Sequence, residues 1–319
     1  MNNDNMDHKF LQDVSATGRK RFWRLKKKQS IMLSESLHRL GQNKKGNRVW
    51  WCAHELEFVV SEITGRKKLI RAGFCRERLC VMCQWRRSMK VFHQVSKVID
   101  RCLAKDNTIQ PIFLTLTVKN CDGDQLREVL DQIFGGWNAL TKHRKIRRIQ
   151  KGWFRALEVT YNQKDGSYHP HFHAILLMDK PYFVGHDYMQ TADWVQMWRT
   201  SCKLDYDPIC DIRRVKPKRG AKHKAVAEVA KYTIKGSQYL YAQDDALTDQ
   251  LVDVIGKSIK GRRLYAFGGM MHKVAKELKI EAAEGDLVNI DEDAIRSDLA
   301  EMIQVYKWSF GVENYVRER

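Results

Sequence analysis

The sequence predicts an α+β fold. Strand-like runs rich in β-branched and aromatic residues cover residues 112–118, 153–161 and 169–177. Helix-like runs cover residues 126–140, 194–202, 224–240 and 270–278, at irregular spacing relative to the strands. The 319 residues are 43% hydrophobic and include only 5 prolines, which excludes a disordered or collagen-like chain. No run of 18 apolar residues is present, so we expect no membrane-spanning helix.

Shifts in composition along the chain predict four segments. Residues 1–48 are polar and basic, as expected of a partly ordered N-terminal arm, and residues 49–105 contain a compact group of cysteines. Residues 109–280 hold the strand-like and helix-like runs, whereas residues 281–319 predict an acidic and then aromatic C-terminal tail. The first ten residues lack the apolar core of a secretory signal. We therefore expect a cytoplasmic protein whose cysteines are thiols or metal ligands rather than disulfides.

The net charge of +19 points to a polyanionic partner. Residues 281–301 contain eight acidic residues and one basic residue, which makes that stretch −7 and the rest of the chain +26. Basic clusters at residues 19–28, 142–148 and 213–224 favour nucleic acid, because cations neutralise phosphates and the aromatic residues of the first cluster can stack on bases. A solvated basic tail is the alternative for the first cluster alone. A membrane-surface helix is disfavoured because no clean apolar stripe accompanies these cations.

Nine cations are assigned to DNA binding. They lie in the first and third basic clusters and just after the group of cysteines: Arg19, Lys20, Arg21, Arg24, Arg86, Arg87, Lys216, Lys218 and Arg219. Long cationic side chains of this kind bind phosphates without reading the base sequence. We therefore expect them to hold the DNA backbone.

Cys75, Cys80 and Cys83 form a compact triplet with the spacing Cys-x4-Cys-x2-Cys. A Cys-x2-Cys turn lets two thiolates reach one tetrahedral ion, and a closed structural zinc site needs four ligands. Cys52 is the preferred fourth candidate, with His54 as the alternative. We therefore expect structural Zn²⁺, with reduced packed cysteines or a redox pair as the alternative interpretations.

Three histidines alternate along the strand-like run 169–177. Alternate residues of a strand share a face, so His169, His171 and His173 point to one side, and Phe172 points to the other side, towards a core. Packing alone does not readily explain three imidazoles at a spacing of two. The row therefore predicts a divalent metal site.

A carboxylate from the preceding strand is expected beside these histidines. Residues 165–166, Asp-Gly, are a hairpin signal, and as a two-residue turn they place Glu158 opposite His173 and Thr160 opposite His171. Two histidines and one Glu favour Mn²⁺ or Mg²⁺ in a site for phosphate, with zinc as an alternative. An exposed strand carboxylate is the other interpretation of Glu158.

The spacing of apolar residues predicts a helix over residues 225–235. At helical spacing this helix carries Glu228, Tyr232 and Lys235 on one stripe, opposite small apolar residues. A Tyr phenol can attack phosphorus, a nearby cation can stabilise the charge that develops, and a carboxylate can deprotonate water or a 3′-hydroxyl. We assign these three catalytic roles to Tyr232, Lys235 and Glu228, in that order. An ion-paired helix face with a boundary Tyr is the alternative.

Together these motifs resemble the HUH endonucleases, and most of all the rolling-circle replication initiators (Rep proteins) of small bacterial plasmids. The first motif matches residues 113–120, the second, the HUH motif, matches residues 169–173, and the third matches residues 228–235. The cysteine triplet and residues 85–88 resemble the family's upstream zinc-like segment, and residues 263–269 resemble its downstream block. The motifs occur in the family's order.

The resemblance implies a central antiparallel HUH endonuclease sheet of about five strands, flanked by helices, with an upstream Cys-rich, zinc-like DNA-binding module. It implies that His171, His173 and Glu158 hold Mn²⁺ or Mg²⁺, with His169 as a less favoured candidate. Tyr232 would then nick origin DNA, leaving a 5′-phosphotyrosine bond and a 3′-hydroxyl primer. Glu228 stands where phage-type relatives have a second Tyr, and it would activate water to end replication after one round.

The resemblance also implies partners and leaves alternatives open. The partners are origin DNA, both duplex and exposed single strand, a host helicase and the replication machinery, and the chain could form a homo-oligomer; no membrane is involved. An HUH transposase or a mobilisation relaxase would share the chemistry, but the single Tyr preceded by Glu favours a replication initiator. A non-catalytic, zinc-containing DNA-binding repressor explains the charge and the cysteines but not the histidine row.

Overall fold

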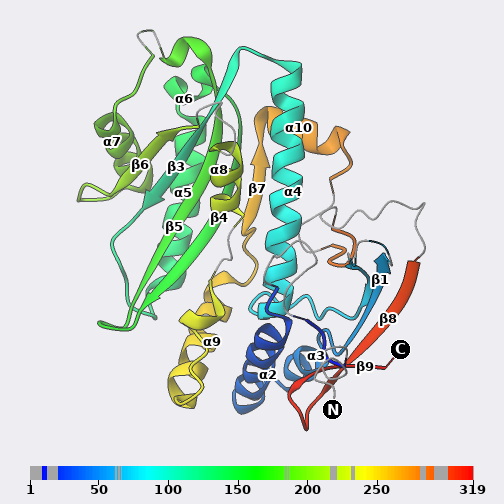
Figure 1. Ribbon diagram of the computed structural model, residues 1–319. Helices are drawn as coiled ribbons and strands as arrows, with labels where there is room; N and C mark the ends of the chain where they lie inside the picture. The colour runs from blue at the N-terminus through cyan, green and yellow to red at the C-terminus, as the bar shows by residue number, and fades with distance from the viewer. Residues whose placement is uncertain are drawn as a thin grey trace. The chain divides into compact units, whose positions relative to one another are not determined.

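The computed structural model describes residues 9–12, 21–61, 63, 65, 67–183, 185, 187–215, 221–230, 234–280, 285–290 and 301–318 (Figure 1). Its helices are α2 (Trp23–Arg39), α3 (Asn43–Trp50), α4 (Val81–Lys105), α5 (Leu126–Lys142), α6 (Arg144–Ile149), α7 (Thr191–Cys202), α8 (Ala221–Val229), α9 (Asp245–Ile259) and α10 (Gly269–Glu277), with short 3-10 helices η1 (Lys180–Phe183) and η2 (Gly236–Gln238). Its strands are β1 (Glu55–Ser61), β2 (Lys67–Ala72), β3 (Ile109–Thr117), β4 (Gln150–Asn162), β5 (Ser167–Asp179), β6 (Cys210–Arg214), β7 (Tyr265–Gly268), β8 (Glu301–Ser309) and β9 (Asn314–Arg317). The α+β class is confirmed, because helices accompany two antiparallel sheets of four and five strands.

The chain folds into two compact units. Unit 1 contains Met1–Lys90, Tyr239–Val252 and Ala283–Arg319, and unit 2 contains Val91–Gln238 and Asp253–Ala282. Both ends of the chain therefore belong to unit 1, whereas composition had suggested a separate arm and a separate tail.

The sheet of unit 1 has the strand order β2-β1-β8-β9. Strand β8, from the expected C-terminal tail, pairs with β1 along its length, with Leu56 opposite Tyr306. Tyr306 and Trp308 alternate with more exposed neighbours and are buried, and the Tyr306 ring lies 6.0 Å from that of Phe58. This alternation is the pattern of a half-buried strand, so the aromatic part of the tail completes a sheet.

Most of the described part of the expected N-terminal arm is helical, because α2 and the first residues of α3 lie in it. Helix α2 buries Trp23, Leu33 and Leu37, and the Trp23 ring meets the Trp85 ring edge to face, with centroids 4.5 Å apart. Aromatic pairs in this arrangement add to the free energy gained from burial. Residues 21–48 therefore contribute to the core of unit 1, while residues 1–8 and 13–20 lie outside the described part of the chain.

The sheet of unit 2 has the order β6-β3-β5-β4-β7, and every pairing in it is antiparallel (Figure 1). The central strand β5 carries the histidine row. Phe172 is fully buried on the opposite face, where its ring lies 5.2 Å from that of Phe134 and 5.8 Å from that of Trp137, both on α5. Core packing on one face therefore fixes which way the histidines point.

The β4–β5 hairpin differs from the expected register. Its turn covers residues 163–166 instead of two residues, with Asn162 paired to Ser167, and Glu158 therefore lies opposite His171 rather than His173. The turn is held by the amide of Gly166, which donates to the Asn162 carbonyl at 2.9 Å, while Gly166 has φ +72°, which a glycine adopts without strain. Because the pairing moves by two residues, every side chain keeps its face.

The helix expected over residues 224–240 is shorter. Helix α8 ends at Val229, and of residues 234–240 only η2, at Gly236–Gln238, is helical. Two residues of low helix propensity follow within seven residues of Val229: the β-branched Ile234 and Gly236. Tyr232 lies in residues 231–233, outside the described part of the chain.

Candidate functional site

One carboxylate and two imidazoles meet on the face of the unit 2 sheet opposite the face that packs on α5. The Nε2 atom of His173 lies 3.0 Å from Oε2 of Glu158, and Nε2 of His171 lies 3.6 Å from the same oxygen. All three side chains are buried, and their ligand atoms lie within 4.8 Å of one another. The structure thus brings together three of the four residues expected to hold the divalent ion.

Contacts at their Nδ1 atoms, the ring nitrogens farther from Glu158, orient the two imidazoles. Nδ1 of His171 donates to the carbonyl oxygen of His169 at 3.2 Å, and Nδ1 of His173 lies 3.1 Å from Oγ1 of Thr115. Contacts of this kind fix the ring and leave the Nε2 lone pair for a metal ion. No role for Thr115 is predicted from the sequence, although Thr115 belongs to the first motif and pairs directly with His173 across β3 and β5.

Glu158 is held in its charged form. Burial alone would raise the pKa of this carboxyl, but hydrogen bonds and charge interactions with His171 and His173 lower the pKa well below its ordinary value. A carboxylate that stays ionised beside two imidazoles offers a divalent cation one anionic oxygen ligand and two ring-nitrogen ligands. This donor set could hold a divalent metal ion.

His169 is not part of this group. Its Nδ1 lies 2.8 Å from Oδ1 of Asn120, and its pKa is lowered, first by burial and then by the nearby His171. It shares the face of the other two histidines, and its ring centroid lies 5.0 Å from that of His171. The structure therefore places His169 next to the trio rather than among its ligand atoms.

Helix α8 brings one expected catalytic residue to the trio. Oε1 of Glu228 lies 3.9 Å from Nε2 of His173, with about a third of the Glu228 side chain exposed. Lys235 is exposed, beyond the end of α8 and just before η2. Tyr232 lies between these two residues in the sequence. The observed contact therefore involves Glu228, the expected general base. Lys235 lies beyond the end of α8, and Tyr232 lies outside the described part of the chain.

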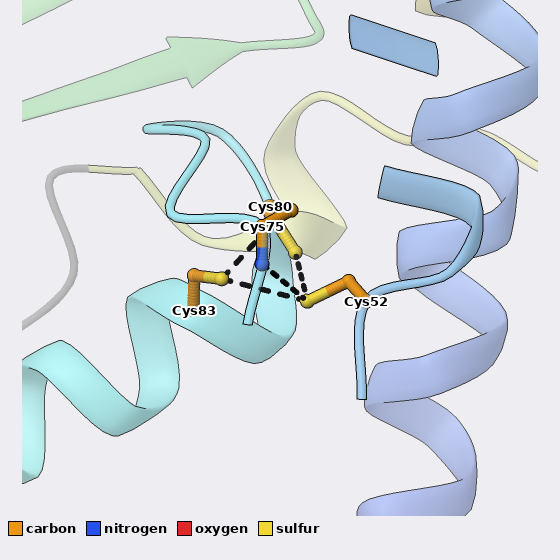
Figure 2. A group of neighbouring side chains, drawn as sticks. All are labelled: Cys52, Cys75, Cys80 and Cys83. Atoms are coloured by element: carbon orange, nitrogen blue, oxygen red, sulfur yellow. Dashed lines mark hydrogen bonds between the residues drawn. The ribbon is translucent and has the colours of Figure 1, made fainter. Parts of the chain in front are cut away.

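The four cysteines form a second candidate metal centre, in unit 1 (Figure 2). The Sγ atoms of Cys52 and Cys83 lie 3.5 Å apart, those of Cys75 and Cys83 3.6 Å apart, and those of Cys52 and Cys80 3.6 Å apart. A zinc ion with four thiolates at 2.3 Å requires sulfur–sulfur distances of about 3.8 Å. The cluster is therefore close to the size that zinc needs.

The local backbone also suits thiolates. The amide of Cys75 donates to Sγ of Cys52 at 3.4 Å, and the amide of Arg76 donates to Sγ of Cys83 at 3.3 Å. Sulfur–sulfur hydrogen bonds, together with burial, raise the pKa of Cys52. Burial would also raise the pKa of Cys80, but hydrogen bonds with the other three sulfurs lower it. Without a cation Cys52 therefore retains its proton and shares a hydrogen bond with Cys80.

His54, the alternative fourth zinc ligand, lies elsewhere. Its ring packs on Trp51, with centroids 4.8 Å apart, and against Phe310, at 5.8 Å. The fourth member of the cluster is Cys52, at the loop before β1.

A buried lysine lies next to this cluster. Nζ of Lys27 donates to the carbonyl oxygens of Trp50, at 2.6 Å, and Cys52, at 2.7 Å. Burial lowers the pKa of Lys27 to about 8, and the nearby Cys52 and Cys80 act in the opposite direction. Lys27 therefore links α2 to the loop that carries Cys52. Its positive charge would partly offset the net negative charge of a zinc ion held by four thiolates.

The cations expected to bind DNA fall into three groups. Arg21 is half-buried, and Arg24 is exposed with its Nε donating to the Glu313 carbonyl at 2.9 Å. Arg86 and Arg87 are each 2% exposed, and Arg86 donates from Nε to the Leu287 carbonyl at 2.8 Å. Neither of these two guanidinium groups reaches the surface, so they contribute to packing and not to a DNA contact in this conformation. The other members lie outside the described residues: Arg19, Lys20, Lys216, Lys218 and Arg219.

Within the described residues, no helix is both long and apolar enough to cross a bilayer.

A sequence model of the family described as "Replication protein" matches residues 66–316. The chain belongs to the replication-protein (Rep) family. This confirms the resemblance to the rolling-circle plasmid Rep initiators that the motifs indicated.

Three Rep relatives align over nearly the whole chain. A "Protein rep" from Bacillus amyloliquefaciens is 36% identical and covers 97% of this chain and 98% of its own length. One from Streptococcus pneumoniae is 34% identical over 98% of this chain and 96% of its own, and one from Lentilactobacillus hilgardii is 33% identical over 97% and 99%. No solved structure matches this chain.

Proposed function

We propose that this Rep protein nicks and rejoins plasmid origin DNA as a tyrosine HUH endonuclease. The observation that carries the proposal is the convergence of Glu158, His171 and His173 beside Glu228, on the helix that precedes Tyr232. Membership of the replication-protein family favours this role over a transposase or a mobilisation relaxase. The five-stranded antiparallel sheet with its histidine row on the central strand agrees with an HUH fold.

The proposed chemistry is a transesterification. The phenol oxygen of Tyr232 bonds to the scissile phosphorus while the bond from phosphorus to the 3′ oxygen breaks. The phenol proton passes to a base or to water, and the leaving 3′ oxygen takes up a proton to become the primer hydroxyl. No ATP is needed for rejoining, because the new ester retains the energy of the phosphodiester.

The side chains of the site have separate roles. Glu158, His171 and His173 would hold Mn²⁺ or Mg²⁺, which supplies Lewis-acid polarisation of the scissile phosphate when bound. Thr115 and the His169 carbonyl keep the two imidazoles in place. Lys235 would offset charge on the phosphate. Glu228 would accept a proton from water or from the 3′-hydroxyl during hydrolysis or rejoining.

The cysteine cluster is proposed as a structural zinc site. Four sulfurs from two loops and the start of α4 converge with no polar ligand among them, which is the donor set of closed zinc sites. The protein would act in the cytoplasm, where plasmid DNA is replicated. Its proposed partners are origin DNA in duplex and single-stranded form, a host helicase and the replication machinery, and it could act as a homo-oligomer.

The test is a nicking assay with the full chain and a supercoiled plasmid carrying the replication origin, in Mn²⁺ or Mg²⁺. We expect open circles whose 3′ end a polymerase extends and whose 5′ end is blocked by protein. Chelator and Glu158→Ala should each abolish the nick. Tight binding of the plasmid without any nick would instead support a DNA-binding repressor and overturn the proposal.

A further inference from the structure

Helices α2 and α3 form a pair of packed helices at the N-terminal side of unit 1 (Figure 1, blue). Three residues, 40–42, connect them, and Gly41 has φ +70°. At the contact, Oγ of Ser34 donates to the carbonyl of Gly46 at 2.7 Å, and a Cβ on Gly46 would lie 2.7 Å from the His38 ring. Gly46 therefore allows α3 to approach α2 closely and fixes which face of α3 is turned outward.

The outward face of α3 has a distinctive composition. Gly46 and Val49 are its buried residues, and on the opposite side Lys44, Asn47 and Arg48 are all exposed. At 3.6 residues per turn these three positions, together with position 51, fall within about 100° of the helix circumference. They therefore form one continuous stripe of two cations and an amide. Trp51 extends it at the helix C-terminus, with 57% of its surface exposed.

Positive charge predominates in the segment that contains α2 and α3. Residues 21–54 contain nine Lys and Arg residues and one carboxylate, Glu35, and α3 contains no carboxylate at all. The nearest acidic partner on the stripe is Glu77, which accepts a hydrogen bond from Nη2 of Arg48. The Arg48 side chain is 59% exposed in that pair. An ion pair exposed to this extent contributes little free energy, so a phosphate or a base edge can replace Glu77.

These features match how proteins read duplex DNA. In helix–turn–helix units a short turn, often with a glycine, presents the second helix to the major groove. Asn is suited to two hydrogen bonds with adenine, Arg to two with guanine, and Lys to phosphate or guanine, whereas aromatic and apolar groups contact thymine methyls. A helix surface that binds another protein more often has apolar residues at its centre. Along the helix axis the middle of this stripe is formed by Asn47 and Arg48, and both are polar.

We infer that α3 is a DNA-reading helix that binds duplex DNA through Lys44, Asn47 and Arg48. The inference rests on the proposed function only for the identity of the ligand as DNA. It concerns a surface in unit 1, and binding of duplex can be measured without any nicking step. Its failure and the failure of the nicking proposal are therefore distinguishable.

The first experiment measures specificity. The full chain, in chelator, selects bound sequences from a library of randomised duplexes, and affinity for the enriched duplex is compared with that for a scrambled one. For Asn47→Ala, we expect the preference to fall by about 5- to 150-fold, the range for loss of one base contact. The salt dependence of binding should stay unchanged, because an amide releases no counterion.

The second experiment measures how much Lys44 and Arg48 contribute to the salt dependence of duplex binding. In Lys44→Gln/Arg48→Gln, the slope of log affinity against log salt should fall by up to about 1.8, as expected if both cations neutralise phosphates. Lys68→Gln, on β2 of the same unit, is the matched control and should keep the wild-type slope. Thermal unfolding of each variant confirms that it is folded.

The inference is overturned if both α3 variants, folded, enrich the same duplex as wild type with unchanged affinity and salt slope. Wild-type protein that binds single strands but no duplex would also overturn it. Loss of a protein partner with duplex binding intact would assign α3 to protein contact instead, and would equally contradict it. Nicking of a single-stranded oligonucleotide, measured in parallel, reports on the nicking proposal alone.

Discussion

The carboxylate of Glu228 lies 3.9 Å from Nε2 of His173. The two residues come from different elements, helix α8 and strand β5, and the contact places the helix beside the Glu158–His171–His173 trio. A carboxylate at this distance can act on water bound near a phosphate without being the main metal ligand. The geometry therefore supports separate roles for Glu158 and Glu228.

The first prediction concerns Glu228. Glu228→Ala should leave the initial nick largely intact, because in the proposed mechanism the phenol of Tyr232, and not water, attacks in that step. Hydrolytic release of the protein from DNA should slow by about 10²- to 10⁴-fold, the usual worth of a general base. Both rates can be followed with one labelled origin substrate. A variant that fails to nick at all would show that Glu228 serves the first step as well.

The second prediction concerns Thr115, which lies 3.1 Å from Nδ1 of His173. Thr115→Val removes this contact while keeping the shape of the side chain, and Mn²⁺ affinity should fall by about 10- to 100-fold. Calorimetric titration with Mn²⁺ measures the change. Thr117→Val is a matched control on the same strand, since Oγ1 of Thr117 donates to the Ile209 carbonyl. Equal losses in both variants would mean that Thr115 has no orienting role.

The third prediction concerns pH. The pKa of Glu158 is lowered from its ordinary 4.5. A lowered pKa in the folded state means that the contribution of Glu158 to stability is present above pH 4.5 and is lost as the pH falls below it. In chelator, wild type should therefore be more stable than Glu158→Gln near neutral pH, and the two should converge in acid. Unfolding by urea at a series of pH values tests this. A difference that grows in acid would contradict it.

The fourth prediction concerns the cysteines. Purified protein should contain about one tightly held zinc per chain, and Cys52→Ser should lose that zinc and melt at a lower temperature. Cys102→Ser, at a buried cysteine outside the cluster, should keep its zinc. His54→Ala should also keep it. Zinc retained in Cys52→Ser but lost in His54→Ala would restore His54 as the fourth ligand.

Much of the Glu158–His171–His173 trio was predictable because strand alternation is a local rule. His171, His173 and Glu158 were assigned to one face from the sequence, and they lie on one face. The register was wrong because a two-residue turn was assumed, whereas the turn covers residues 163–166. The assignment of side chains to faces was nevertheless correct. The error in register was two residues, and an even shift keeps each side chain on its face.

Other features depended on contacts between distant parts of the chain. The aromatic residues after position 301 were interpreted as a tail, although the alternation of Tyr306 and Trp308 was a strand signal. A strand becomes stable only with a partner, and β8 pairs with β1, far away in the sequence. The sequence likewise predicts DNA binding for Arg86 and Arg87, because sequence alone does not reveal their burial within α4.

The central claim is that Tyr232 is the nucleophile. The most direct test isolates the covalent protein–DNA product formed with origin DNA and Mn²⁺, digests it, and identifies the nucleotide-linked residue by mass spectrometry. We predict a 5′-phosphodiester on Tyr232 and no adduct in Tyr232→Phe. An adduct on another residue, or one that persists in Tyr232→Phe, would contradict the account.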